Sequence, residues 1–262
     1  MATGFFTDTT VCIGCKACEV ACKQWNQLPD DGMYFSGMSL DNTVALGAST
    51  WRHVAFIERP VPLSGQTAGN FSWLMLSDVC KHCARAGCLE ACPTGAIMRT
   101  EFDSVYVQPD ICNGCGYCVV NCPFGVIDRL EDDGRAWKCT LCYDRQKDHM
   151  EPACAKACPT DSIIFGDVAQ LREKAEERLA QLHERGVKEA YLYGADAASQ
   201  PGTEGLNAFF LLVDKPEVYN LPPAPVAPAK RVKESWRSLA IASIGLLATA
   251  VGAVMTTQPK SR

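Results

Sequence analysis

The chain has 262 residues, of which 47% are hydrophobic and 21% are charged, with a mean hydropathy of -0.05 and a formal net charge of -5. This composition excludes a disordered chain, a collagen-like chain and a polytopic membrane protein. The negative charge also argues against nucleic-acid binding, because no basic domain is available to neutralise phosphates.

Cysteine is the unusual residue type, with 16 copies that fall into four sets of four. The first and third sets have the spacing C-x2-C-x2-C-x3-C, the second C-x2-C-x4-C-x3-C and the fourth C-x2-C-x11-C-x3-C. Proline follows the last cysteine of every set except the first, which has Lys23 there. In chain order the sets are Cys12, Cys15, Cys18 and Cys22; Cys80, Cys83, Cys88 and Cys92; Cys112, Cys115, Cys118 and Cys122; and Cys139, Cys142, Cys154 and Cys158.

This spacing is typical of iron-sulfur proteins. Three closely spaced cysteines wrap one short loop around a cluster, and in two-cluster ferredoxins the fourth thiolate ligates the other cluster. The proline ends the local turn, and Gly14, Gly114 and Gly116 would let backbone amides approach the cluster sulfide. The four complete sets therefore predict four 4Fe-4S clusters, with all 16 cysteines as metal ligands.

Two other uses of cysteine fit less well. A structural zinc site takes two ligand pairs separated by a longer loop, so only the fourth set, with its eleven-residue gap, is also compatible with zinc. Disulfides are disfavoured because cysteines three positions apart in one loop are poorly placed to bridge each other. The histidines have no ligand-like spacing, and we interpret all four as structural or solvated: His53, His82, His149 and His183.

Between the cysteine sets, the chain predicts short strands and turns. Residues 30–79 form an insertion with strands expected near 51–57 and 71–76. Residues 97–107 and 126–137 contain turn signals at Asp103-Ser104 and Asp133-Gly134, and predict β-hairpins that link successive cluster loops. The predicted fold class is α+β, with tandem ferredoxin-type 4Fe-4S modules over residues 1–166.

After the fourth set the sequence changes character. Asp167 is a candidate N-cap for a helix with apolar residues at helical spacing from Val168 to Leu182, and Gly186 is its stop. An apolar strand is predicted at 208–213. Residues 216–229 contain five prolines and predict a semi-rigid extended linker, or a strap along a partner surface. We group residues 167–229 as a helix, a short strand and this linker.

From Ser238 to Gln258 the chain has 21 consecutive uncharged residues. At about 1.5 Å per residue, a helix of this length spans the roughly 30 Å hydrocarbon core of a bilayer. We therefore predict a C-terminal transmembrane anchor over residues 230–262, the alternative being a buried core helix. Trp236 and Arg237 before the segment, and Lys260 and Arg262 after it, suit the interface. Small residues would let another membrane helix pack closely: Gly245, Ala248, Thr249 and Gly252.

The side of the membrane stays open. Met1 to Val11 has neither the basic start nor the apolar run of a signal peptide. The positive-inside rule alone would keep the cluster domain in the cytoplasm, because more basic residues precede the apolar segment than follow it. Export attached to a signal-bearing partner would instead place the domain on the periplasmic side, which is our expectation.

The residues around the cysteines resemble the iron-sulfur (beta) subunit of membrane-bound formate dehydrogenases. The resemblance is closest over residues 8–166 and looser over 214–219 and the C-terminal helix. Electron-transfer subunits of other molybdopterin oxidoreductases share the four-cluster pattern. The segments around the cysteines are therefore what favours a formate dehydrogenase subunit over these others. These segments are CIGCKACEVACKQWN at 12–26, CKHCARAGCLEACPTGA at 80–96, DICNGCGYC at 110–118 and WKCTLCYDR at 137–145.

What this resemblance implies is a non-catalytic electron-transfer subunit. Electrons would enter from a catalytic subunit with a molybdenum or tungsten pterin and leave to a membrane cytochrome b that reduces quinone. It also implies crossed ligation. One cluster would bind Cys12, Cys15, Cys18 and Cys158; another Cys139, Cys142, Cys154 and Cys22; a third Cys80, Cys83, Cys88 and Cys122; and the last Cys112, Cys115, Cys118 and Cys92.

Two alternative functions are also compatible with the sequence. One is the equivalent subunit of a sulfoxide, polysulfide or nitrate reductase, and the other is a free-standing soluble polyferredoxin, against which the apolar C-terminal segment argues. Of the basic residues beside the ligands, we expect at least half to be solvated, and we predict that Lys138 tunes or bridges clusters. These residues are Lys16, Lys23, Lys81, Arg85, Lys138 and Lys156.

Overall fold

The computed structural model describes residues 1–32, 35, 37, 43, 45–59 and 71–256. The chain divides into one unit at Met1–Ala227 and a second at Pro228–Arg262. The elements of the first unit are β1 (Thr3–Asp8), α1 (Ala17–Asn26), β2 (Arg52–Arg59), β3 (Ser72–Val79), α2 (Gly87–Glu90), β4 (Ile97–Arg99), β5 (Val105–Val107), α3 (Tyr117–Val120), β6 (Asp128–Arg129), β7 (Ala136–Trp137), α4 (Tyr143–Lys147), α5 (Ala153–Lys156), β8 (Ile163–Asp167), α6 (Val168–Glu184), β9 (Tyr191–Tyr193), β10 (Ala208–Leu212) and η1 (Pro216–Tyr219). The second unit contains η2 (Pro228–Arg231) and α7 (Val232–Thr256).

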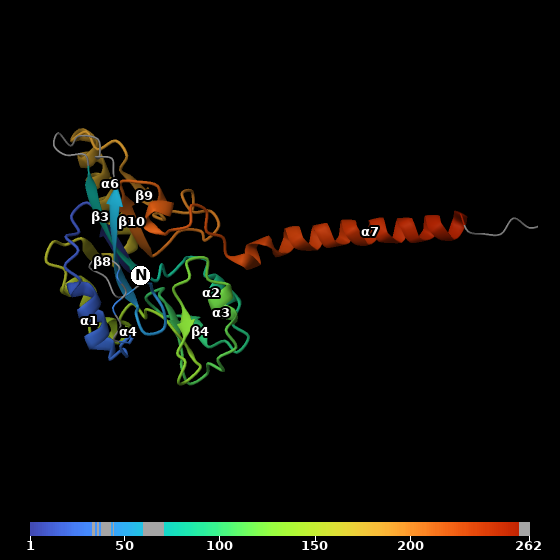
Figure 1. Ribbon diagram of the computed structural model, residues 1–262, viewed down its shortest axis with the longest axis horizontal. Helices are drawn as coiled ribbons and strands as arrows, with labels where there is room; N and C mark the ends of the chain where they lie inside the picture. The colour runs from blue at the N-terminus through green and yellow to red at the C-terminus, as the bar shows by residue number, and fades with distance from the viewer. Residues whose placement is uncertain (33–34, 36, 38–42, 44, 60–70, 257–262) are drawn as a thin grey trace, which may run out of the picture. The chain divides into compact units, whose positions relative to one another are not determined.

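A four-stranded mixed sheet connects the beginning of the first unit to its end (Figure 1). The strand order is β8-β1-β10-β9, with β1 parallel to β10 and antiparallel to β8. In this register Phe6 pairs with Phe209, which lies far later in the sequence. In the sequence, all four cysteine sets therefore lie between β1 and β8, which are neighbouring strands of this sheet. The sheet thus brings the two ends of the cysteine-rich region together.

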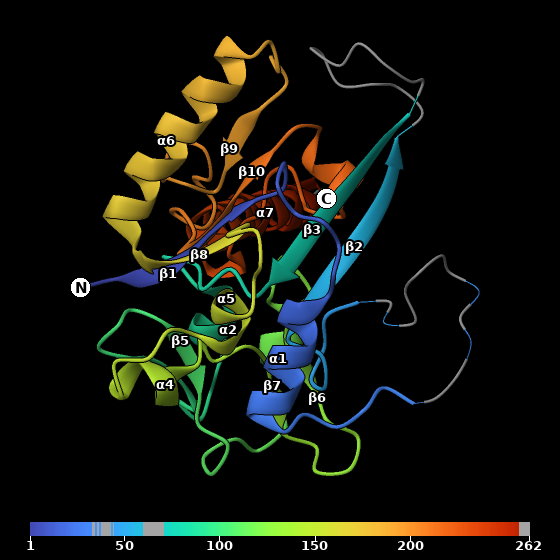
Figure 2. The same cartoon turned by 90° about the vertical axis from the view of Figure 1, so that its left-hand side faces the viewer.

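The two faces of this sheet contact different parts of the unit, because side chains alternate along a strand. On one face Phe6 stacks on Phe209, with ring centroids 5.5 Å apart, in the core that also contains Leu171 of α6. On the other face Phe5 and Ala208 belong to the core that contains buried cysteines. Figure 2 shows α6 running alongside the sheet, which therefore separates this helix from the cysteine-rich region.

Several elements confirm the sequence predictions. Asp167 caps α6, since its side chain accepts hydrogen bonds from the backbone N–H groups of Ala169 (3.0 Å) and Gln170 (3.2 Å). The predicted hairpins are β4–β5 and the shorter β6–β7, and the insertion forms the antiparallel pair β2–β3. Strand β10 is the apolar strand expected at 208–213. The mixture of helices and strands agrees with the predicted fold class.

The sequence analysis did not predict β1, α1 and β9. Helix α1 continues past Cys22 to Asn26, whereas α2, α3 and α5 have only four residues each. The difference follows from the residue after the last cysteine. Proline there cannot continue a helix, but Lys23 can, so the first set has a longer helix than the others.

Residues 216–227 correct the prediction of an extended linker. Tyr219 is buried, and its neighbours fold against the first unit instead of spanning a gap. The hydroxyl of Tyr193 donates to the carbonyl of Pro222 (2.5 Å), and the N–H of Ala227 donates to the carbonyl of Gly202 (3.1 Å). The prolines fix their own φ angles, but they allow the turns by which this segment packs on its own domain.

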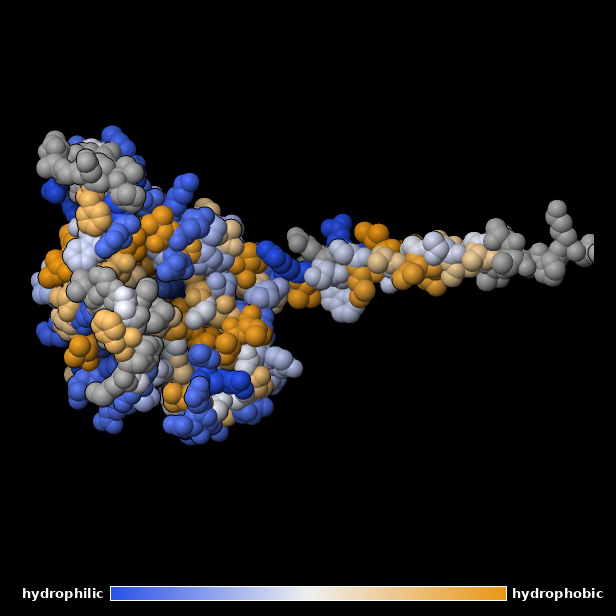
Figure 3. All heavy atoms as spheres, in the orientation of Figure 1, coloured by the Kyte–Doolittle hydropathy of each residue, from blue (hydrophilic) through white to orange (hydrophobic). Residues whose placement is uncertain are grey.

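The second unit contains a helical segment over 228–253, most of it in α7, that is long and apolar enough to cross a membrane, with a mean hydropathy of 1.4 in its most apolar window. None of that window is buried. Figure 3 shows hydrophobic atoms along this helix, where Leu239, Ile241 and Leu246 are exposed. Gln258, at the end of the predicted span, and the flanking Lys260 and Arg262 lie outside the described residues.

Candidate iron-sulfur cluster sites

The four C-x2-C loops share one backbone feature. The residue before the second cysteine of each loop has a positive φ between 42° and 71°. These residues are Gly14, His82, Gly114 and Leu141. A left-handed residue turns the chain sharply within the loop, and it is costly for His82 and Leu141, which have a Cβ atom. The second and fourth loops must therefore be held by their surroundings.

Gly14 and Gly114 also have no room for a side chain. A Cβ atom on Gly14 would lie 2.6 Å from a ring carbon of Phe56, and one on Gly114 would lie 2.5 Å from the carbonyl oxygen of Gly134. The close approaches seen at these two glycines are thus to protein atoms. The expected approach of their amides to cluster sulfide stays a prediction.

A short helix separates the third cysteine of each set from the fourth. In the first set Cys18 and Cys22 both lie on α1, and in the other sets the fourth cysteine follows the end of α2, α3 or α5. Four residues of helix rise about 6 Å along the axis. The fourth thiol is therefore displaced from the loop that presents the first three.

The structure brings the 16 thiols into four groups, each with three cysteines of one set and one cysteine of another. Two groups each line one small cavity. In the other two groups, three thiols lie close enough to the fourth to raise its pKa, which is the pKa of Cys22 in one group and of Cys118 in the other. They are the Cys12 group (Cys12, Cys15, Cys18, Cys158), the Cys22 group (Cys22, Cys139, Cys142, Cys154), the Cys80 group (Cys80, Cys83, Cys88, Cys122) and the Cys92 group (Cys92, Cys112, Cys115, Cys118).

The groups form an ordered series of neighbours. Thiols of the Cys12, Cys22 and Cys80 groups lie in one buried cluster, and thiols of the Cys80 and Cys92 groups lie in another. Within these clusters, a thiol of each later group raises the pKa of a thiol in the group before it, in the order of the Cys12, Cys22, Cys80 and Cys92 groups. At the two ends of this series, Cys15 and Cys115 are exposed. The linking pairs are Cys18–Cys154, Cys139–Cys80 and Cys88–Cys118.

Burial disfavours the thiolate form of several of these cysteines. It raises the pKa of Cys18 and Cys142 to about 11 and that of Cys88 to about 12, with neighbouring thiols adding to the effect. A thiol must lose its proton to ligate iron, and a bound metal provides the positive charge that stabilises the thiolate. The buried groups are thus suited to a cationic iron core rather than to free thiolates.

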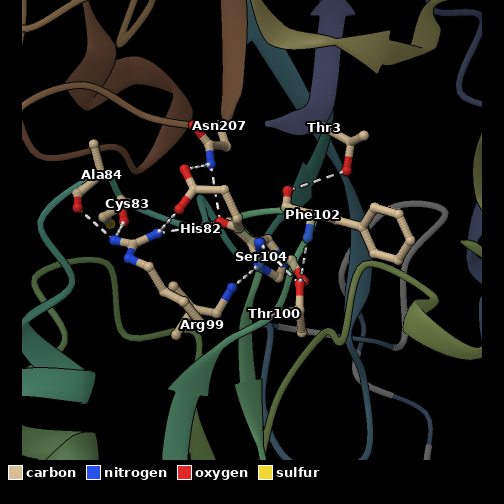
Figure 4. A network of polar contacts seen from close by, with 11 residues as sticks. Thr3, His82, Cys83, Ala84, Arg99, Thr100, Phe102, Ser104 and Asn207 are labelled. Carbon is tan, nitrogen blue, oxygen red and sulfur yellow. Dashed lines mark hydrogen bonds and ion pairs between the residues drawn. The ribbon is translucent and has the colours of Figure 1, made fainter. Parts of the chain in front are cut away.

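A polar network holds the loop of the second set (Figure 4). Nδ1 of His82 accepts a hydrogen bond from the backbone N–H of Val105 (3.1 Å), and Arg99 donates to two backbone carbonyls of the loop. Arg99 also pairs with Asp103 (3.0 Å), which accepts from the side chain of Asn207 (3.0 Å). These contacts connect the loop to β4, β5 and the start of β10. His82 is buried among them, in agreement with the structural role expected for it.

Family comparisons define the class of protein. Two models, each described as a 4Fe-4S dicluster domain, match residues 11–96 and 71–168, and together they include all four cysteine sets. The chain is thus an iron-sulfur protein with two matches to 4Fe-4S dicluster domains along its length, which fit four 4Fe-4S clusters. The second match includes the whole fourth set, and so favours a cluster there over zinc.

Whole-chain relatives define the family. The nitrate-inducible formate dehydrogenase iron-sulfur subunit of Escherichia coli (strain K12) is 38% identical over 251 residues, covering 94% of this chain and 81% of the relative. The formate dehydrogenase-O iron-sulfur subunit of the same organism is 40% identical over 253 residues, covering 92% and 78%. The chain therefore belongs to the family of formate dehydrogenase iron-sulfur subunits, as the phrases around the cysteines predict. Its relatives are iron-sulfur subunits, not catalytic ones.

A third relative is more distant. The B subunit of the anaerobic dimethyl sulfoxide reductase of Escherichia coli (strain K12) is 33% identical over 171 residues, which cover 65% of this chain and 76% of the relative. Similarity to this chain therefore extends beyond formate dehydrogenase subunits to a subunit of a sulfoxide reductase.

Of the six basic residues beside the cysteines, Lys81 and Lys138 are buried and the other four are at least partly exposed. The ammonium of Lys138 donates to the carbonyls of Val105 and Cys139, the latter at 3.1 Å. Burial disfavours its charged form, but the thiols of Cys80, Cys88 and Cys139 overcome this and raise its pKa. Lys138 therefore holds a positive charge between the Cys22 and Cys80 groups.

Neutralising this charge, as in Lys138→Met, is expected to lower the reduction potential of the neighbouring clusters, because a cation favours the added electron. A tenfold change in the one-electron equilibrium, about 59 mV, is the expected size. The measurement is a redox titration followed by electron paramagnetic resonance. Lys156→Met, which removes an exposed charge, is the control and should leave the titration unaltered. An unchanged titration for Lys138→Met would show that this lysine has no tuning role.

Proposed function

We propose that the chain carries electrons from a catalytic subunit that oxidises formate at a molybdenum or tungsten pterin to a membrane cytochrome b that reduces quinone. The observation that supports this most is the continuous series of four thiol groups with an exposed cysteine at each end. A protein that connects two redox partners needs access at two places and an unbroken path between them.

In this proposal each thiol group holds one cluster. The support is that every group joins three cysteines of one set to the last cysteine of another, which is the ligation pattern of two-cluster ferredoxins. When bound, a 4Fe-4S cluster supplies one-electron transfer at a potential set by net charge, hydrogen bonds and solvent exposure.

The chain's own residues would set these conditions. Leu141 and Ile127 are buried beside the cysteine loops and exclude water. Lys81 is buried next to the Cys80 group, where its ammonium lies 5.2 Å from the ring centroid of Phe124 and is paired with Asp78. A fixed positive charge next to a cluster favours its reduced form.

The proposal includes a membrane anchor formed by residues 230–262, beyond a four-cluster domain at 1–166 and a connecting region at 167–229. The uninterrupted apolar run in α7 and its exposed apolar side chains support this. Trp236, which is exposed at the start of the run, suits the membrane interface. Gly245 and Gly252 would let a helix of the cytochrome pack closely on α7.

We place the cluster domain on the periplasmic side, through export together with the catalytic subunit. The basic residues Lys230 and Arg231 ahead of α7 favour the opposite orientation, so this part of the proposal depends on the partner's export signal. Protease added to cells with a permeabilised outer membrane should cleave the first unit. Complete protection of that unit would place it in the cytoplasm.

Formate added to membranes that contain this chain is expected to reduce its clusters, as read by electron paramagnetic resonance. Membranes that lack the chain are the control, because their formate-dependent iron-sulfur signals come from other proteins. If dithionite reduces the clusters but formate does not, the assignment to formate oxidation is wrong.

The dimethyl sulfoxide reductase relative supports a second candidate, in which electrons flow toward a sulfoxide-reducing subunit. The same membranes distinguish the two functions. Dimethyl sulfoxide added to pre-reduced clusters should reoxidise them in the second case and leave them reduced in the first.

A further inference from the structure

Arg52, at the start of β2, is a fully buried cation that the sequence analysis did not single out. Its side chain is 1% exposed, and its guanidinium carbon lies 4.8 Å from the ring centroid of Phe5. Nη1 donates to the hydroxyl (3.1 Å) and the carbonyl (3.3 Å) of Ser77 on β3. Nε and Nη2 are buried without a hydrogen-bond partner among the described residues. A buried charge with unpaired donors is costly. Nε and Nη2 of the guanidinium can therefore still donate hydrogen bonds to a further acceptor.

The Phe5 ring that the guanidinium contacts belongs to one buried cluster with thiols of two groups, namely Cys18, Cys22, Cys139 and Cys154. Burial opposes the charged form of Arg52, but the thiols of Cys154, Cys18, Cys139 and Cys22 outweigh it and raise the pKa. Cys18 belongs to the Cys12 group and the other three to the Cys22 group. Arg52 therefore lies at the junction between the first two groups of the series.

Ser77 connects Arg52 to only one of these groups. Its hydroxyl oxygen lies 3.3 Å from the sulfur of Cys18 and accepts a hydrogen bond from Nη1 of Arg52. Because the oxygen is already an acceptor for the guanidinium, its own proton is available to Cys18. The hydroxyl thus acts on the Cys12 group, whereas the charge of Arg52 acts on both groups.

We propose that Arg52 is the charge-compensating residue between the clusters of the Cys12 and Cys22 groups, that its unpaired N–H groups serve their sulfur atoms, and that it raises both reduction potentials. The inference rests on the proposed assignment of clusters to thiol groups. Clusters held by four thiolates carry net negative charge, so neighbouring clusters repel each other's electrons. A fixed cation between them lowers the free energy of adding an electron to either cluster.

This role also explains what the insertion at 30–79 contributes. Strands β2 and β3 pair Val54 with Ser77 and Arg52 with Val79, which places Arg52 and Ser77 together at the end of the hairpin nearest the cysteines. Lys138 occupies the next junction of the series. The two junctions on either side of the Cys22 group therefore each contain a buried cation.

The test compares Arg52→Met, Arg52→Lys and Ser77→Ala in the assembled complex by redox titrations followed by electron paramagnetic resonance. Arg52→Met should lower the potentials of both flanking clusters by about 59 mV or more, a tenfold change in each one-electron equilibrium. Ser77→Ala should lower only that of the Cys12 group, and Arg52→Lys should retain most of the wild-type value. Arg59→Met, at the other end of β2, is the matched control and should have no effect.

Iron and acid-labile sulfide are measured on the same samples. Full cluster content with unchanged potentials in Arg52→Met overturns the proposed role of Arg52. Wild-type protein with less iron than four clusters require overturns the assignment of the thiol groups instead. If Arg52→Met does not accumulate, Arg52→Gln, which also removes the charge, takes its place, and full cluster content with wild-type potentials in that variant refutes the inference.

Discussion

Replacing Cys22 and Cys139 by alanine, one at a time, is expected to abolish the same cluster, although these residues belong to different sets. Cys18→Ala, four positions from Cys22, should abolish a different one. The reason is that Cys22 lies with Cys139, whereas Cys18 lines the cavity of the Cys12 group. Each variant should lose about a quarter of the iron, and electron paramagnetic resonance should identify which signal disappears.

Thr140→Ala is the matched control, because Thr140 lies in the same loop as Cys139 and carries no ligand thiol. It should keep all four signals. The Cys139 variant should also stop formate from reducing the clusters beyond the gap, since the Cys22 group lies inside the series. If Cys18→Ala and Cys22→Ala lose the same signal, each set binds its own cluster and the crossed assignment is wrong.

Much of the local architecture was predictable because its signals are local. The cysteine spacing determines four loops with similar turns, and Asp167 caps α6 by contacts within three residues of itself. The hairpins follow from turn residues between short apolar segments. Each of these features depends on side chains close together in the sequence.

Strand β1 and the packing of the proline-rich segment were missed because they depend on distant contacts. Strand β1 is stabilised by pairing with β8 and β10, and nothing near residues 3–8 indicates those partners. The proline-rich residues 216–227 resemble a linker in sequence, and only their contacts with distant parts of the first unit, such as the burial of Tyr219 and the hydrogen bond of Ala227 to Gly202, show that the segment folds back.

The same distinction separates the two cations of the candidate site. Lys138 could be predicted to tune clusters because it adjoins Cys139 in the sequence. Arg52 is far from every cysteine in the sequence and resembles any strand arginine. Its role becomes visible only when β2 and β3 bring it to Ser77 and Cys18.

Ending the chain after Ala227 is expected to release the cluster domain from membranes. In the full chain, burial of the exposed apolar side chains of α7 in lipid would contribute roughly 10 kcal/mol, at about 1.5–3 kcal/mol for each large aliphatic residue. These include Leu239, Ile241, Ile244, Leu246, Leu247 and Val251. Full-length chain should therefore stay with membranes washed in alkaline carbonate, and the truncated chain should appear in the supernatant.

The cut at Ala227 matters, because Tyr219 and Ala227 are buried in the first unit and an earlier end would expose its core. Iron content in the released chain is the control for folding and should match that of the full chain. Gly245→Leu is a second control, which should stay in the membrane but bind its partner helix less well, since close packing needs a small residue. Full-length chain that washes off would favour the soluble polyferredoxin, whereas truncated chain that resists the wash, yet retains its clusters, would place the attachment on the cluster domain itself.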